Sequence, residues 1–151
     1  MKSGGRITIL FITINLFIAA LLAAILVGGV GKLLQVLIEW PLNFGLGIAA
    51  MYALGFYIGN WMETLIQQKK WNGVLTGMMG AMLILFIGTF VGAMVGFFLE
   101  GVPYWQRTQD LGSAMEDYLL KPLYWIFAFG TIPTIIAGSI LGVRLKKNVP
   151  A

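Results

Sequence analysis

The chain has 151 residues, of which 59% are hydrophobic and only 11% are charged. A water-soluble domain carries about 25% charged residues, so a chain this poor in charge is expected to lie in a lipid bilayer as a single transmembrane domain over residues 1–151. The absence of cysteine and histidine excludes disulfides and thiolate nucleophiles, and it removes the commonest metal ligand and general base. We therefore expect no cofactor and no metal site. The net charge of +4 lies outside the apolar stretches, which indicates membrane orientation and no binding of nucleic acid.

The first apolar stretch covers residues 7–30 and is interrupted only by Thr8, Thr13 and Asn15. A signal peptide has an apolar region of only about 7–15 residues, so the longer stretch predicts an uncleaved transmembrane helix. Residues 31–41 follow, with their apolar residues on one helical face. Two structures fit this segment: a short helix that lies on the outer membrane surface and ends at Pro41, or a continuation of the first helix into the headgroups.

Three further apolar stretches predict transmembrane helices over residues 42–66, 73–99 and 122–143. Small residues recur every four positions in these stretches, so each row lies on one helical face. Such a face lets the backbones of two membrane helices approach closely. We predict helix packing along Gly55 and Gly59; Gly73, Gly77 and Ala81; Gly88, Gly92 and Gly96; and Gly138 and Gly142. Pro133 is expected to kink the last helix.

Residues 100–121 form the one long connection, and we expect an outer loop there because Gly101 and Pro103 should end the third span. The sequence Ser113-Ala114-Met115-Glu116 matches a capping box, which predicts a surface-lying helical turn that begins after Ser113. Three acidic residues lie close together in this connection: Asp110, Glu116 and Asp117. They could hold a divalent cation, but a solvated acidic face is the favoured interpretation.

The distribution of lysine and arginine predicts the orientation in the membrane. With four spans, both termini and the link 67–72 share one side, which carries seven of the ten basic residues. We therefore expect an integral protein of the plasma membrane, such as the bacterial inner membrane, with both termini in the cytoplasm. The segments 31–41 and 100–121 then lie outside.

Four polar residues are expected near mid-membrane by helical rise: Asn15, Thr89, Thr131 and Thr134. They could line a narrow polar path, but hydrogen bonds between helices are the favoured interpretation. Glu63 is the nearest ionisable residue and lies about one turn from the inner boundary. An ion pair at headgroup level is the favoured interpretation, and a gate or partner contact at the cytoplasmic mouth is the alternative.

These observations predict an all-α membrane protein, a bundle of four transmembrane helices with short amphipathic segments on the outer side. We find no catalytic constellation and expect no enzyme. The favoured hypothesis is a subunit or accessory component of a membrane complex, which packs against other membrane-protein subunits through its glycine-rich helices. The alternative is a small homo-oligomeric channel or transporter for a small solute or ion. Apart from these, the expected partner is the lipid bilayer.

Overall fold

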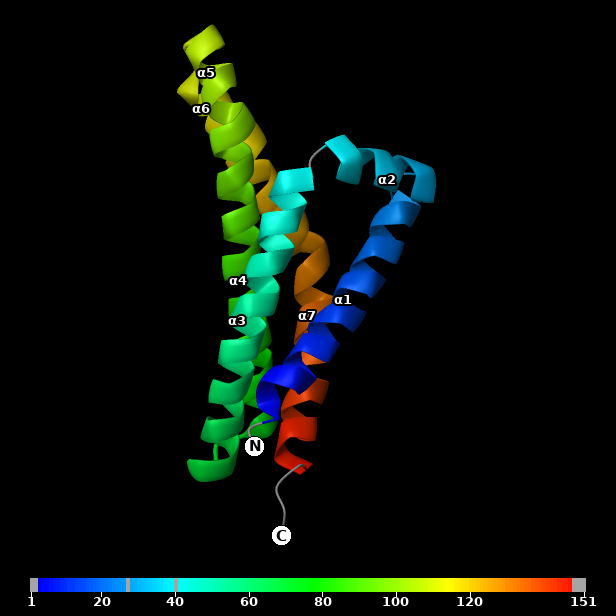
Figure 1. Ribbon diagram of the computed structural model, residues 1–151, viewed down its shortest axis with the longest axis vertical. Helices are drawn as coiled ribbons and strands as arrows, with labels where there is room; N and C mark the ends of the chain where they lie inside the picture. Colours follow the sequence, from blue (N-terminus) through cyan, green and yellow to red (C-terminus); the bar gives the residue numbers. More distant parts are fainter. Residues whose placement is uncertain (1–2, 27, 40, 148–151) are drawn as a thin grey trace.

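The computed structural model describes residues 3–26, 28–39 and 41–147, and these ranges contain helices and no strands (Figure 1). The predicted all-helical class is thereby confirmed. The helices are α1 Gly4–Leu26, α2 Val30–Glu39, α3 Pro41–Gln68, α4 Gly73–Gly96, α5 Val102–Thr108, α6 Leu111–Met115 and α7 Lys121–Lys147, with the π-helical turns η1 Phe97–Gly101 and η2 Glu116–Leu120.

Three helical stretches of the described residues are long and apolar enough to cross a membrane: Gly4–Ile25, Gly73–Thr108 and Leu111–Lys147. The chain therefore has the properties of a membrane protein. The remaining long helix, α3, has 28 residues and packs against both α1 and α4. That α3 forms a fourth span remains a prediction.

The first helix ends earlier than the predicted range 7–30, because two glycines break it. Gly28 and Gly29 have φ values of +88° and +126°, which side chains other than glycine rarely tolerate. A separate helix, α2, follows at Val30 and runs across from the end of α1 to the start of α3 (Figure 1). Of the two structures that fitted residues 31–41, the separate helix is the one found. Val27 and Trp40, which fall within the two predicted ranges, lie outside the described residues.

Gly101 and Pro103 do not break the helix, contrary to the prediction. The chain continues as one helical rod from Gly73 to Thr108. Directly before Pro103 lies η1, whose last bond runs from the Val102 N–H to the Phe97 carbonyl, five residues back. This wider turn changes the hydrogen-bond register where the proline ring would otherwise meet the carbonyl four residues earlier.

The capping box predicted at Ser113 is also wrong, because Asp110 caps the helix instead. Its carboxylate accepts hydrogen bonds from the Ser113 N–H at 3.0 Å and from the Ser113 hydroxyl at 2.6 Å. The returning rod begins at Leu111, directly after the left-handed residue Gln109. The predicted loop 100–121 is therefore almost entirely helical, and its two arms pack against each other instead of lying across the bundle (Figure 1).

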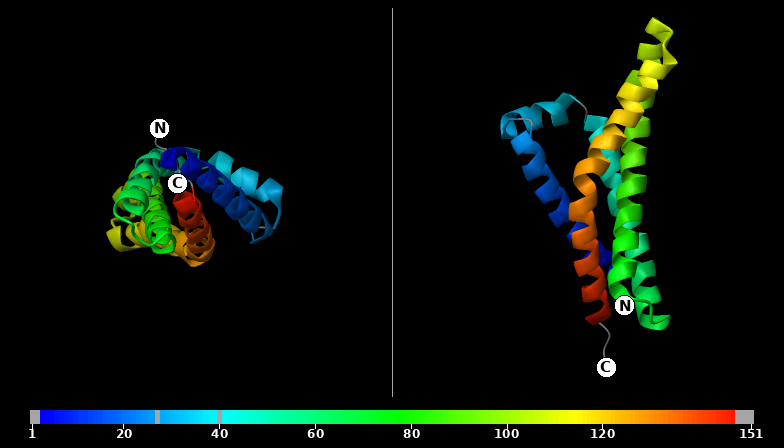
Figure 2. Two further views of the ribbon diagram at one scale, coloured as in Figure 1. Left: turned by 90° about the horizontal axis from the view of Figure 1, so that it is seen from below. Right: turned by 180° about the vertical axis from the view of Figure 1, so that it is seen from behind.

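The last helix, α7, continues this returning rod, so it starts one residue before and ends four residues after the predicted range 122–143. Pro133 lies inside α7. The ribbon of this rod changes direction in its orange part (Figure 2), as expected where a proline removes a helical hydrogen bond.

Most of the predicted packing residues lie in contacts between helices of this one chain. At the α4–α7 interface a Cβ on Gly73 would lie 2.7 Å from the Gly142 carbonyl oxygen, and a Cβ on Gly138 would lie 2.7 Å from the Ala81 Cβ. Such distances require glycine, since real Cβ atoms essentially never approach below 3.0 Å. The other predicted positions are also close to neighbouring helices or buried: Gly77 faces Gly138 and Gly142; Gly88 faces Met51; Gly92 lies beside Gly47; Gly55 faces Ile12; Gly59 faces Thr8; and Gly96 is buried.

Candidate binding cavity

A cavity of about 840 Å³ lies between α1 on one side and α3, α4 and α7 on the other. Near its N-terminus α1 lies close to α3 and α7, and it leans away from both toward α2 (Figures 1 and 2). The lining residues of α4 run from Ala81 to Gly96, a rise of roughly 22 Å along that helix. Phe17 of α1 and Phe129 of α7 both line the cavity and are exposed. The cavity therefore opens to the protein surface between these two helices.

The end of the cavity near the two termini is closed by a packed apolar cluster. Met62 and Ile66 of α3 contact Leu141 and Leu145 of α7, and all four side chains are buried. Phe11 of α1 packs against this cluster and also lines the cavity. The cavity is thus open at its side and closed toward the termini.

A polar latch holds the start of α1 against α3 just beyond this cluster. The carboxylate of Glu63 accepts hydrogen bonds from the Ser3 hydroxyl at 2.9 Å and the Gly4 N–H at 3.0 Å, while the Asn60 side-chain oxygen accepts one from the Gly5 N–H at 2.9 Å. The first N–H groups of a helix have no partner within the helix, and an anion there also interacts favourably with the helix dipole. Glu63 and Asn60 therefore cap α1 from another helix.

The two interpretations offered for Glu63 can be compared with this geometry. Among the described residues Glu63 forms no ion pair with lysine or arginine, and Gln67 is its remaining partner. Its contacts join two helices at the closed end of the cavity. A gating role remains a prediction, and the latch gives it a physical basis.

Three of the four polar residues expected at mid-membrane line the cavity: Asn15, Thr89 and Thr134. The Asn15 amide donates a hydrogen bond to the Thr134 hydroxyl at 3.1 Å, which joins α1 to α7. The Thr89 side chain is only 3% exposed, and its hydroxyl has no hydrogen-bond partner among the described residues. The fourth residue, Thr131, does not line the cavity, and its hydroxyl donates to the Phe127 carbonyl at 2.6 Å.

Sequence reasoning missed a second polar pair that lines the same cavity. The hydroxyls of Thr13 on α1 and Tyr52 on α3 lie 2.9 Å apart. Thr13 interrupts the first apolar stretch, so its polarity was visible, but its partner lies 39 positions away on another helix. Thr8 also lines the cavity, and its buried hydroxyl has no partner among the described residues.

The polar side-chain groups available in the cavity are hydroxyls, an amide and the indole N–H of Trp125, on an apolar wall. Among the described residues that line it, none is Asp, Glu, Lys or Arg. Hydroxyls and amides donate and accept hydrogen bonds but do not carry charge near neutral pH. The arrangement can therefore bind an uncharged, largely apolar molecule and orient one polar group of it.

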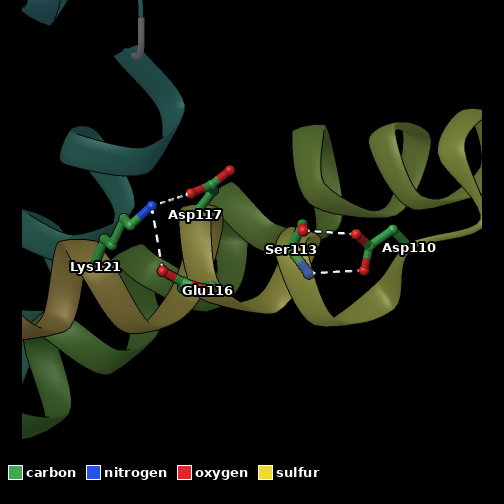
Figure 3. A network of polar contacts seen from close by, with 5 residues as sticks. All are labelled: Asp110, Ser113, Glu116, Asp117 and Lys121. Carbon is green, nitrogen blue, oxygen red and sulfur yellow. Dashed lines mark hydrogen bonds and ion pairs between the residues drawn. The ribbon is translucent and has the colours of Figure 1, made fainter.

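Three acidic residues of the predicted outer loop, Asp110, Glu116 and Asp117, have structural partners (Figure 3). Asp110 caps α6, and its bonds to the Ser113 hydroxyl and N–H hold the pKa of its carboxyl below the ordinary value. Glu116 and Asp117 both pair with Lys121, at 3.4 Å and 2.6 Å. The acids are thus divided between a helix cap and an ion pair.

Comparison of the chain with protein-family models, with curated proteins and with solved structures gives no match.

Proposed function

We propose that the chain is a non-catalytic membrane protein that takes up a small, largely apolar molecule in the cavity between α1 and α3, α4 and α7, and that it acts as a small transporter. The observation that carries this proposal is the convergence of Asn15, Thr89 and Thr134 on one cavity. That cavity is open at its side and closed at one end by a packed cluster and a polar latch. A carrier needs such a site, accessible from one direction at a time.

The proposal includes α3 as a fourth span and both termini on the cytoplasmic side. With 28 residues, α3 is about 42 Å long, which exceeds the roughly 30 Å of a bilayer core. Seven of ten basic residues then lie on the side of the termini. In a plasma membrane such as the bacterial inner membrane, the closed end of the cavity would then face the cytoplasm.

In the test, the protein is purified in mild detergent and the small molecules bound to it are extracted and identified. Transport of these molecules into proteoliposomes that contain the protein is then measured. Gly130→Leu is the informative variant, because a Cβ at Gly130 would make only ordinary contacts, the nearest at 3.5 Å from Leu85. The added side chain should occupy the cavity without breaking a helix interface. We expect it to abolish retention and flux, whereas Gly45→Leu, which points into open space, should leave both unchanged. Unchanged flux in Gly130→Leu would overturn the proposal.

A second function, an accessory component of a membrane complex, is favoured by the exposure of α1. Only 11% of its apolar window is buried, against 33% and 22% for the other two span-capable stretches. The glycine rows are largely engaged within the chain, so a partner subunit or a second copy would pack on α1 instead. Crosslinking from a photoreactive residue at Ile14, which is exposed on α1, tests this. A lone monomer with no crosslinked partner in native membranes would count against it.

A further inference from the structure

We infer that the cavity recognises an uncharged amphiphile, a hydrocarbon chain that ends in a carbonyl or hydroxyl group, and that its polar end binds at Asn15 and Thr134. This inference rests on the proposed function and adds the chemical class of the molecule. It follows from three features of the cavity: its unsatisfied polar groups, its lack of charge and the way it opens.

The polar end is defined by groups with spare hydrogen-bonding capacity. The Thr134 hydroxyl accepts from Asn15 and so keeps its own O–H to donate, while the Asn15 amide keeps its oxygen and a second N–H. Together these groups can donate to a carbonyl or exchange hydrogen bonds with a hydroxyl.

The lack of charge excludes an ionised headgroup as the bound end. A carboxylate, phosphate or ammonium group placed here would lose its water and meet no described lysine, arginine, aspartate or glutamate in the lining. An unpaired charge in such surroundings is strongly disfavoured. A neutral polar group loses far less hydration, and the Asn15 and Thr134 side chains can replace what it loses.

The apolar body of the molecule is indicated by the walls and the opening. The lining is dominated by aliphatic and aromatic side chains, and the volume of about 840 Å³ lies within the range of roughly 300–1,000 Å³ common for small-molecule sites. The Asn15–Thr134 bond ties α1 to α7. A transmembrane helix about 10 Å wide could not pass between these helices without breaking that bond, whereas a hydrocarbon chain can lie beside it.

The experiment uses the full chain in lipid nanodiscs with three photoreactive probes that share one hydrocarbon chain: palmityl alcohol, palmitate and cetyltrimethylammonium, each with a diazirine in the chain. Labelled peptides are mapped by mass spectrometry. We expect the alcohol to label the lining residues of α1, α4 and α7 about tenfold more than either charged probe does, because one well-made hydrogen bond changes a binding constant by about this factor. Unlabelled palmityl alcohol should compete.

Matched threonine variants locate the polar end. Thr134→Val keeps the side-chain shape and should remove most of the preference for the alcohol. Thr131→Val is the matched control, because Thr131 lies outside the cavity on the same helix, and it should keep the preference. Circular dichroism of each variant checks that the helices are intact. Equal labelling by all three probes would refute the inference and leave the proposed function standing. Absence of any label in the cavity would refute both, and an equal loss in Thr131→Val would refute the assignment of the polar end.

Discussion

Substituting Gly77 by alanine should separate α4 from α7, because the two backbones leave no room for a single methyl group. A Cβ at Gly77 would lie 2.7 Å from the Gly142 Cα and nitrogen and closer still to the Gly138 carbonyl oxygen, whereas ordinary contact begins at 3.4 Å. The helices must therefore move apart by at least 0.7 Å, the difference between these distances. The atoms in the way belong to the backbone and cannot rotate aside. We expect a loss near the upper end of the usual cost of overpacking, about 3 kcal/mol.

The assay is unfolding in mixed micelles titrated with sodium dodecyl sulfate and followed by tryptophan fluorescence. Gly45→Ala is the control, because a Cβ there meets no atom within 4 Å and alanine favours a helix over glycine by up to about 1 kcal/mol. A double variant with Gly142→Ala should cost less than the two single losses added, since the first substitution already opens the interface. Equal midpoints for Gly77→Ala and Gly45→Ala would refute the account of backbone contact.

The remaining predictions concern the α3–α4 interface, the latch at Glu63 and the cap that Asp110 forms on α6. Leu85→Ala should cost only about 2 kcal/mol, because Leu85 already borders the cavity. Gly92→Leu should cost more, because Gly92 lies against Gly47. Equal losses of stability in the same titration would contradict this. Glu63→Gln removes the charge that caps α1 and should cost about 2 kcal/mol. The readout is the reaction of maleimide with Thr8→Cys, a buried position on α1, which should become faster in the presence of Glu63→Gln. Glu116→Gln is the control and should leave the rate of this reaction unchanged. The pKa of Asp110 is lowered in the folded chain, so the stability it adds to α6 is present above the ordinary carboxyl pKa and is lost as pH falls through the lowered value. The amide resonance of Ser113 should follow this titration, and in Asp110→Asn it should not move over the same range.

The sequence was sufficient to predict the helical class, three apolar stretches and most of the glycine positions at helix interfaces, because these depend on local composition and a spacing of four. It failed at Pro103, where a π-helical turn changes the register on which the proline rule depends. It also failed at Ser113, because Asp110 stands three residues earlier and caps equally well. The bond between Asn15 and Thr134 joins residues 119 positions apart, and no local pattern in one sequence specifies which distant helices meet. Whether Thr131 lines the cavity depends likewise on how α7 is rotated about its axis, which no local pattern specifies.

The forces that hold α1 differ from those that hold the other long helices, and this difference bears on how a bound molecule could enter and leave. In a bilayer the hydrophobic effect does not drive helices together, because lipid chains are as apolar as leucine. The α4–α7 pair is held by close backbone contact at its glycines, which is lost steeply when the helices separate. The start of α1 packs on Gly55 and Gly59 of α3 and is capped by Glu63 and Asn60. Farther along, α1 is attached by the hydrogen bonds of Thr13 with Tyr52 and of Asn15 with Thr134. An uncharged molecule that bonds to the free Thr134 O–H and the free Asn15 amide oxygen would leave their mutual bond intact, so α1 would stay attached to α7 while the molecule enters beside that bond.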